Sequence, residues 1–215
     1  MAFHGWPAEA LEFFDGLEAD NSKTYWQAHK QDYETLVRGP MEALLAELAP
    51  EWGEGKIFRP YRDVRFSKDK SPYKTTIAAM VGEGYVQVSA DGLAAGCGMW
   101  EMAADQLERY REAASEDASG AKLTALVVDA RRAGLDVMSH GELKTAPRGY
   151  PKDHPRIELL RYKGLVTWRA WPAAAWLGTA RAKDRVSGSF TASEPIRAWL
   201  NPHVGPSRLP ARVGR

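Results

Sequence analysis

The sequence predicts an α+β fold in which an antiparallel β-sheet meander is flanked by N-terminal and C-terminal helices. Apolar residues follow a helical period over the first fifty residues, a period of two between residues 56 and 99, and a helical period again after residue 100. Short turn signals separate the candidate strands, which favours antiparallel neighbours over a doubly wound parallel sheet. Helices and strands therefore come in separate runs, as in α+β proteins.

The N-terminal run reads as three helices. Pro7 suits a first helical turn, where its missing N–H has no intrahelical partner. Asn21 or Ser22 can cap the second helix with a side-chain oxygen, and Gly39-Pro40 is expected to break it. The three predicted helices are Pro7–Ala19, Lys23–Val37 and Pro40–Pro50.

The middle of the chain predicts four strands joined by tight turns. Gly82-Glu83-Gly84 and Asp91-Gly92 are short hairpin signals. Sequential strands with such turns imply a meander. The predicted strands are Lys56–Phe66, Thr75–Val81, Tyr85–Ser89 and Leu93–Met99.

The rest of the chain returns to helices, with a few short strands. Helices are expected at Ala103–Ser115, Ala121–Ala133, Pro155–Tyr162, Pro172–Arg185 and Ser193–Leu200, and strands at Leu135–Met138, Glu142–Thr145 and Val166–Arg169. No repeat or low-complexity linker divides the chain. One domain over residues 1–202 is therefore predicted, followed by a flexible tail at 203–215 that is rich in Pro, Gly and Arg.

Composition and charge exclude several classes of protein. The chain has 215 residues and a formal net charge of +1, which disfavours a protein that coats nucleic acid or an anionic membrane over its whole surface. Its single cysteine, Cys97, excludes an internal disulfide or a multi-cysteine zinc site and fits a reducing compartment. No signal peptide and no membrane-spanning run are visible, so the predicted location is the cytoplasm.

One segment carries far more positive charge than the rest. Between residues 56 and 74 there are seven Lys or Arg and two Asp, a net charge of +5. Arginine offers rigid, bidentate donors to phosphate or carboxylate, and lysine adds point charges. The segment is therefore a candidate anion site. Its predicted ligand-binding residues are Arg62, Asp63, Arg65, Lys68, Lys70, Tyr73 and Lys74.

The same residues have a purely structural interpretation. Asp63 could neutralise an arginine, and the lysines could form a solvated turn. Strand periodicity puts Arg62 on the side of Val64 and Phe66, and a buried arginine there would need a carboxylate partner such as Glu34. Both interpretations stay open at this point.

A second cationic cluster precedes the helix expected at residue 155. Its predicted ligand-binding residues are Lys144, Arg148 and His154, because free N–H groups at a helix start also attract anions. Asp153 or His154 could instead be the N-cap of that helix. If the loop folds over the basic segment, the two clusters would form one anion pocket.

Other chemistry has weaker signals. His29 could act as an acid or base, or could simply pack. The five histidines are scattered, so no metal site is expected. Ser67 to Lys70 matches S-x-x-K but lacks the companion motifs of that enzyme class. Gly96-Cys97-Gly98 is not a dinucleotide fingerprint, so no cofactor is predicted.

Three blocks of the chain resemble the DUF2461 family of uncharacterised bacterial and fungal proteins. They are FFDGLEADNSKTYWQAHKQDYETLVRGP (13–40), YRDVRFSKDKSPYKT (61–75) and LKTAPRGYPKDHPRIELLRYKG (143–164). The resemblance implies a cytoplasmic, single-domain α+β protein. It implies no activity, substrate or catalytic residue. One departure is visible, because Asn21-Ser22 stands where the family usually has two asparagines.

The predicted function is recognition of a phosphorylated or other anionic small molecule, with no catalytic residue assigned. One alternative is a nucleic-acid-binding module that uses Trp26, Tyr61 and Tyr73 as stacking surfaces. The other is a structural or interaction protein whose arginines only form ion pairs. No membrane partner is expected. Whether the protein is an enzyme, and its oligomeric state, are left open.

Overall fold

The computed structural model describes residues 2–65 and 68–210, which form two compact units. Unit 1 consists of Met1–Ala95 and Ala170–Gly188, and unit 2 of Gly96–Arg169 and Ser189–Arg215. Strands β4 (Gly92–Met99) and β6 (Leu165–Pro172) and helix α8 (Arg181–His203) have residues in both units. The single domain expected over residues 1–202 stays a prediction.

The strands pair in the order β1-β2-β3-β4-β6-β5, with β1 to β4 following one another as a meander. The antiparallel pairs include β1 (Gly55–Ile57) with β2 (Thr76–Val81) and β2 with β3 (Gly84–Ser89). Strand β5 (Asp136–Met138) pairs antiparallel with β6. The predicted α+β class and the meander are therefore confirmed.

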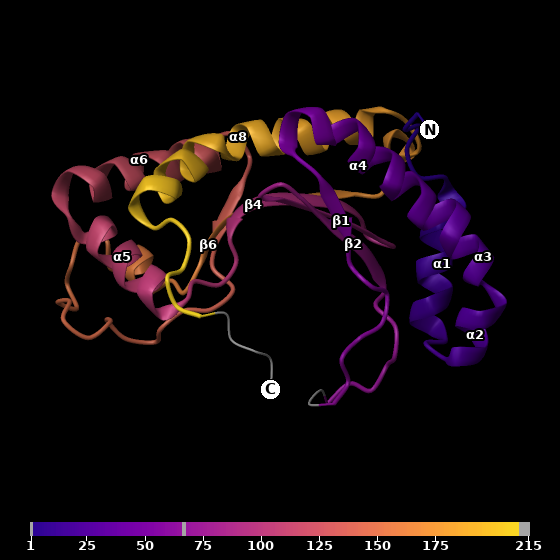
Figure 1. Ribbon diagram of the computed structural model, residues 1–215, viewed down its shortest axis with the longest axis horizontal. Coiled ribbons are helices and arrows are strands. Elements are labelled where there is room, and N and C mark those ends of the chain that lie inside the picture. Colours follow the sequence, from indigo (N-terminus) through magenta and orange to yellow (C-terminus); the bar gives the residue numbers. More distant parts are fainter. Residues whose placement is uncertain (1, 66–67, 211–215) are drawn as a thin grey trace. The chain divides into compact units, whose positions relative to one another are not determined.

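The N-terminal helices all belong to unit 1 (Figure 1). They are α1 (Ala8–Ala19), α2 (Lys23–Ala28), α3 (Lys30–Asp32), the π-helix η1 (Tyr33–Arg38) and α4 (Gly39–Trp52). Helix α4 packs on β1 and β2 through a buried stripe that includes Met41, Leu44 and Leu48. This packing sets which face of the strands lies in the core.

The helix break predicted at Gly39-Pro40 is wrong. Helices α3, η1 and α4 follow one another without a gap from Lys30 to Trp52. The N–H of Gly39 donates to the carbonyl of Glu34, five residues earlier, so the chain makes one wider turn before Pro40. Pro40 then lies in the first turn of α4, where proline is tolerated.

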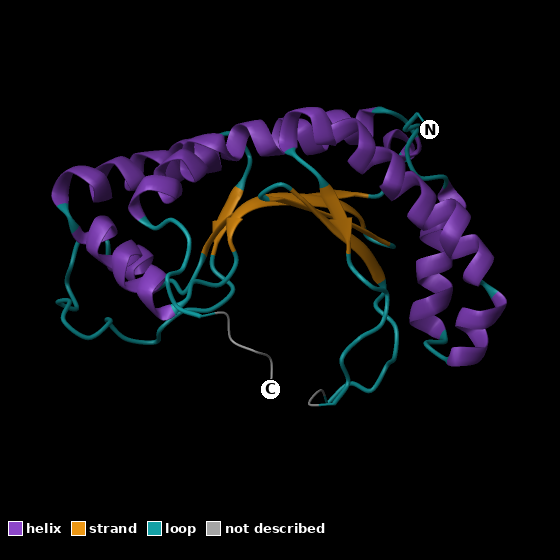
Figure 2. Ribbon diagram, viewed as in Figure 1, coloured by secondary structure: helices purple, strands orange, loops and turns teal. Residues whose placement is uncertain are grey.

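The two faces of β1, β2 and β3 differ in character. One face carries Ile57, Ile77, Ala79, Val81, Val86 and Val88, and α4 covers it (Figure 2). The register places the alternate residues on the opposite face, which we call the outer face. Its residues are Lys56, Thr76, Ala78, Met80, Tyr85, Gln87 and Ser89, joined by Phe58, whose N–H donates to the carbonyl of Ala78.

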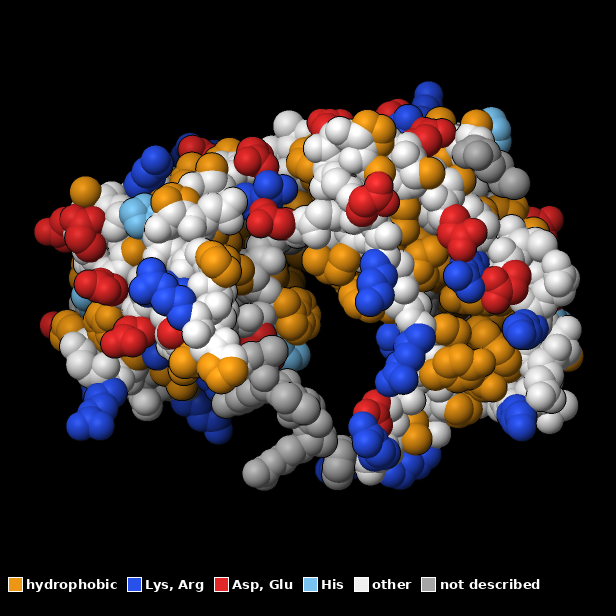
Figure 3. Space-filling view, in the orientation of Figure 1, with side chains coloured by type: hydrophobic (Ala, Val, Ile, Leu, Met, Phe, Trp, Pro, Cys, Tyr) orange, Lys and Arg blue, Asp and Glu red, His pale blue; other side chains and the backbone are white. Residues whose placement is uncertain are grey.

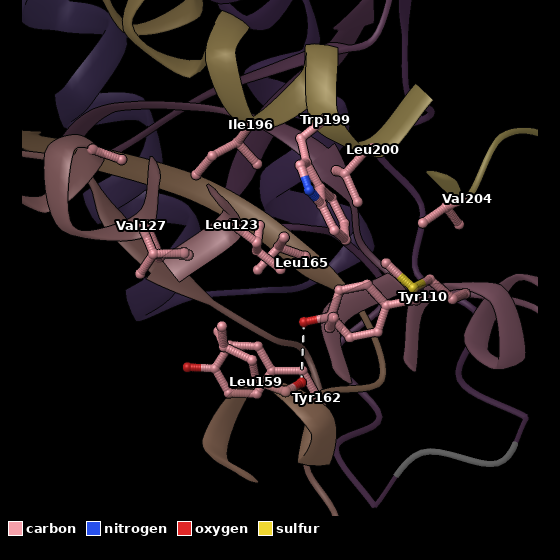
Figure 4. Packing of buried hydrophobic residues seen from close by; sticks show 14 of the residues in the cluster. Tyr110, Leu123, Val127, Leu159, Tyr162, Leu165, Ile196, Trp199, Leu200 and Val204 are labelled. Carbon is pink, nitrogen blue, oxygen red and sulfur yellow. Dashed lines mark hydrogen bonds between the residues drawn. The ribbon is translucent and has the colours of Figure 1, made fainter. Parts of the chain in front are cut away.

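Unit 2 has its own hydrophobic core (Figure 4). Its helices are α5 (Ala104–Ser115), α6 (Asp117–Arg132), α7 (Ile157–Arg161) and the last part of α8. Tyr110 and Trp199 are fully buried among aliphatic side chains. The Tyr110 hydroxyl donates to the carbonyl of Leu159 at 3.0 Å, and burial raises the pKa of Tyr110.

Several predicted elements in the second half have different bounds. The two closing helices are instead a short 3-10 helix, η2 (Ala175–Gly178), and the continuous helix α8, which contains Pro195 and Pro202. The strand expected at Glu142–Thr145 is reduced to an isolated bridge between Glu142 and Tyr162. None of the helices in the described ranges is long and apolar enough to cross a bilayer.

The C-terminal tail has specific contacts as far as Arg208. The Ser207 hydroxyl and the Arg208 N–H donate to the carboxylate of Asp105 at 2.8 and 2.7 Å. Arg109 donates to the carbonyls of Val204 and Pro206. The flexible tail expected at residues 203–215 stays a prediction, and residues 211–215 lie outside the described ranges.

Candidate anion-binding site

Residues 58–65 and 68–75 form the two arms of a loop, which we call the basic hairpin. Strand β1 ends at Ile57, and beyond it the arms meet in an isolated bridge between Tyr61 and Tyr73. The Arg62 N–H donates to the carbonyl of Pro72 at 2.9 Å, and the Lys74 N–H to the carbonyl of Pro60 at 2.8 Å. The arms are therefore antiparallel although they are not regular strands.

The predicted strand from Lys56 to Phe66 is wrong beyond Ile57. Ile57 pairs with Ala79, whereas the next bridge joins Tyr61 to Tyr73. Three residues on the first arm (58–60) thus face five on the second (74–78), so a regular ladder cannot continue. Phe66 and Ser67, including the serine of the S-x-x-K match, lie outside the described residues.

The side chain of Asn21 anchors the second arm. Tyr61 and Tyr73 form a non-hydrogen-bonded pair, so the N–H and C=O of Tyr73 point away from the first arm. The Asn21 amide donates to the Tyr73 carbonyl at 3.1 Å and accepts from its N–H at 3.0 Å. Of the two predicted caps, Ser22 is the one that caps α2, by accepting from the Tyr25 N–H.

The Tyr73 ring belongs to an aromatic cluster. It stacks on Trp26 with centroids 4.4 Å apart and planes 8° apart, and it lies 5.5 Å from the ring of Tyr61. Trp26 also contacts Tyr33, and burial raises the pKa of Tyr33 to about 12. Tyr73 is 5% exposed and Tyr61 48% exposed. The Tyr73 ring therefore packs the hairpin against α2, and the ligand-binding role expected for Tyr73 stays a prediction.

Both arginines singled out in the sequence are paired within the hairpin itself. Arg62 forms an ion pair with Asp69, and Arg65 donates to both carboxylate oxygens of Asp63 at 2.9 and 2.7 Å. The partner suggested for Arg62, Glu34, instead pairs with Arg38. The local ion pairs therefore use the two acids of the hairpin.

These contacts keep both aspartates ionised. The side-chain and backbone donors of Arg65 lower the pKa of Asp63 to about 2. The hydroxyl and N–H of Ser71, together with Arg62, lower the pKa of Asp69 to about 2. At neutral pH each carboxylate thus holds a fixed negative charge against its arginine.

The lysines of the hairpin differ in their surroundings. Lys68 is exposed, and the Lys70 ammonium donates to the carbonyl of Val64 at 2.9 Å. The Lys74 ammonium lies 5.6 Å from the centroid of the Phe58 ring. Partial burial, and then the positive charge of Arg59, lower the pKa of Lys74. No carboxylate of the described residues forms an ion pair with Lys74 or Arg59.

The outer face beside this pair of cations contains no acidic residue among its members. Lys56 and Phe58 are exposed there, and Met80, Tyr85 and Gln87 are half-buried. Figure 3 shows Lys and Arg side chains next to a group of hydrophobic ones in unit 1. The root of the basic hairpin therefore combines an apolar surface with positive charge that Asp63 offsets only in part, through its interaction with Arg59.

The second predicted cluster lies in unit 2, whereas the basic hairpin lies in unit 1. Lys144 and Arg148 are exposed. His154 is half-buried, and its Nδ1 accepts from the N–H of Arg156 at 3.0 Å, close to the capping role considered for it. Helix α7 begins at Ile157 rather than at Pro155. Convergence of the two clusters stays a prediction.

Arg156 is a buried arginine that the sequence did not single out. Its guanidinium donates to the carbonyls of Ala114 and Ser115 at 2.8 and 2.6 Å, and its side chain is 12% exposed. These carbonyls end helix α5, where such groups lack intrahelical donors. Arg156 thus has a structural role in unit 2.

A groove of about 450 Å³ lies between α4 and β1. The charged residues that line it are balanced, with Arg38 and Lys56 against Glu42 and Glu54. Arg38 is also held by Glu42 at 2.9 Å. The groove is therefore a poorer anion site than the root of the basic hairpin.

The remaining candidate groups have ordinary surroundings. His29 is half-buried, its Nδ1 lies 3.1 Å from the Asp32 carboxylate, and its ring packs on Tyr25. Cys97 is buried, and its N–H donates to the Thr167 hydroxyl at 3.3 Å. Within the part of the chain that the structure describes, no three His, Cys, Asp or Glu side chains are grouped so as to hold a metal ion.

Sequence reasoning missed Phe58, Arg59 and Asn21. The first two lie inside the charged segment, but their relation to Lys74 depends on the uneven arms of the hairpin. Asn21 gave only a capping signal. The near-literal family block at 61–75 pointed to the hairpin but not to its root.

Comparison with known proteins adds a family and no activity. No curated protein and no solved structure matches the chain. A family model matches residues 9–199, which include Asn21, the basic hairpin and the segment around His154. The chain therefore belongs to the family described as "Conserved hypothetical protein (DUF2461)".

Proposed function

We propose that unit 1 binds a small anionic ligand at the root of the basic hairpin, with Arg59 and Lys74 as its principal donors. The observation that carries the proposal is the half-buried Lys74, whose ammonium lies 5.6 Å from the centroid of the Phe58 ring and forms no ion pair with a carboxylate of the described residues. Burial, and then the positive charge of Arg59, lower the pKa of Lys74, in agreement with a cationic site there. Two cations that share a site stabilise an anion between them, because the anion removes their mutual repulsion. Lys56, on the adjoining outer face, adds a third positive charge.

The proposal assigns a different role to Arg62 and Arg65. Their ion pairs with Asp69 and Asp63 support the structural interpretation of these two arginines. An anion would have to compete with a carboxylate already in place. Lys68 and Lys70, nearer the tip of the hairpin, would contribute long-range attraction rather than contacts.

Phosphate and carboxylate groups are the chemistry that suits this site. A guanidinium offers paired N–H donors and an ammonium a compact charge, a combination that phosphate oxygens can accept together. A cytoplasmic location is part of the proposal, supported by the single cysteine of the sequence, which permits no internal disulfide.

The test is a binding titration by calorimetry with phosphate, pyrophosphate, sulfate and a dicarboxylate. Arg59→Gln and Lys74→Gln are compared with Arg65→Gln, which removes the same kind of charge from an ion pair at an exposed position. We expect the first two to weaken binding at least about tenfold, as loss of a charge-assisted hydrogen bond predicts. Equal loss in Arg65→Gln, or no binding of any anion by the wild type, would overturn the proposal.

A further inference from the structure

We infer that the ligand carries a nucleobase as well as phosphate, with the base stacked on Phe58. The inference rests on the proposed anion site and adds the chemical class of its ligand. Phe58 is 38% exposed and belongs to the same outer face as Lys56. A planar ring beside cations suits a ligand that is flat at one end and anionic at the other.

Phe58 is held as part of a platform. Its ring lies 6.2 Å from the ring of Tyr85 on β3, with planes 37° apart. The Lys74 ammonium lies 5.6 Å from the Phe58 centroid. A base that packs on the exposed part of the Phe58 ring would therefore place an attached phosphate near Lys74.

The same face offers a polar group that could contact the edge of a base. The Gln87 side-chain oxygen accepts from the Tyr85 hydroxyl at 2.9 Å, which fixes the orientation of the amide. No described residue accepts from the amide NH₂ of Gln87. This group would then donate to a ring nitrogen or carbonyl oxygen of the base.

The absence of acids on the outer face favours the phosphate end of such a ligand. Its members Lys56, Thr76, Met80 and Gln87 are basic, hydroxylic, apolar or amide-bearing. Free nucleotides and single-stranded nucleic acid share the required chemistry of base and phosphate. They differ in the number of phosphates that contact the protein, and salt dependence reports that number.

The experiment compares pyrophosphate, adenosine, ADP and a five-nucleotide single strand as ligands of the full-length protein. ADP is expected to bind about 5- to 150-fold more tightly than pyrophosphate, the range that base stacking on an aromatic side chain provides. Phe58→Ala should reduce the ratio of ADP affinity to pyrophosphate affinity to about one, and a ratio that stays at the wild-type value would overturn the inference. Phe58→Tyr keeps the ring and should retain ADP binding.

Each outcome separates the two proposals. Equal binding of ADP and pyrophosphate by the wild type overturns the nucleobase inference and leaves the anion site intact. No binding of either overturns both. Tighter binding of the single strand, with a salt slope larger than that of ADP, identifies nucleic acid as the source of the base. Equal affinities of ADP and the single strand identify the free nucleotide as the source of the base.

Discussion

The side-chain amide of Asn21 makes both of the hydrogen bonds that a neighbouring strand would make to Tyr73. The hydrogen bonds between the two arms are made by the neighbours of Tyr73, because Pro72 accepts from Arg62 and Lys74 donates to Pro60. The N–H and carbonyl of Tyr73 therefore point away from the first arm. One side chain therefore anchors the basic hairpin to the start of α2. The stacked pair of Tyr73 and Trp26 completes the attachment.

We expect Asn21→Ala to loosen the hairpin. Two partly buried hydrogen bonds are lost, which predicts a decrease of about 1–3 kcal/mol in the free energy of unfolding, measured by urea denaturation. Anion binding should weaken in the same variant. Ser22→Ala, which removes the cap of α2, is the matched control: it should destabilise by about 1 kcal/mol but leave anion binding unchanged. Equal loss of binding in both variants would contradict the anchoring role.

The pKa values of Asp63 and Asp69 predict how the hairpin responds to acid. Both are lowered from 3.8 to about 2, so each carboxylate stabilises the folded hairpin above pH 3.8. That contribution is lost as the pH falls toward about 2, because the unfolded state then binds more protons than the folded state. Carbon NMR of the carboxyl groups should give both midpoints near pH 2.

The two carboxylates have separate donors, which provides an internal control. Arg65→Gln should raise the midpoint of Asp63 toward its ordinary value and leave Asp69 unchanged. Ser71→Ala should do the reverse. If either substitution shifts both midpoints equally, the hairpin does not contain two independent ion pairs.

Two arginines should differ sharply in their contribution to stability. Arg65 is 69% exposed on its side chain, so Arg65→Ala should change the free energy of unfolding by no more than about 1 kcal/mol. Arg156 is mostly buried and satisfies carbonyls at the end of α5, so Arg156→Ala should lower it by about 2–4 kcal/mol. Denaturant unfolding of both variants checks the difference. Similar losses would contradict the distinction between surface pair and buried anchor.

The same substitution should have opposite effects at two glycines. Gly82 has φ +54 in the turn between β2 and β3, and an added Cβ would lie 1.9 Å from the carbonyl oxygen of Trp52. Gly82→Ala should therefore lower the melting temperature by several degrees. Gly188 lies inside α8 with nothing near its Cβ position, so Gly188→Ala should raise the free energy of unfolding by about 0.5–1 kcal/mol. A stabilising Gly82→Ala would disprove the turn geometry.

The elements with a strong local signal were the predictable ones. The hairpin turn at Gly82 and the alternating strand at 85–89 follow from turn chemistry and a period of two. The helices of the first fifty residues follow from apolar spacing, although the π turn at 33–38 replaced the expected break. The wider turn is made by the bond from the Gly39 N–H to the Glu34 carbonyl, which the local helix propensity of these residues does not predict.

The candidate site was predictable in place but not in detail. The excess of positive charge in the sequence predicted the position of the hairpin. It did not predict that Arg62 and Arg65 form ion pairs with Asp69 and Asp63, which are only seven and two residues away in sequence. A strand period of two predicts that Arg62 lies on the buried side. The two arms of the hairpin have unequal lengths between their paired residues, so regular strand pairing ends after Ile57. The pairing of Phe58 with Lys74 depends on that irregularity, so no periodic pattern could have revealed it.

The π turn at Tyr33–Arg38 also determines which changes in chain length the first unit can accept. It contains one residue more than an α-helical turn of the same span, as the bond from Gly39 to Glu34 shows. Removing one residue there would restore α-helical spacing with α4 in nearly the same rotational phase relative to α3, because the longer π step and the shorter α step each complete about one helical turn. Met41, Leu44 and Leu48 would stay on the buried side, so the first unit should accept the loss of one residue in the π turn more readily than the loss of one residue within α4.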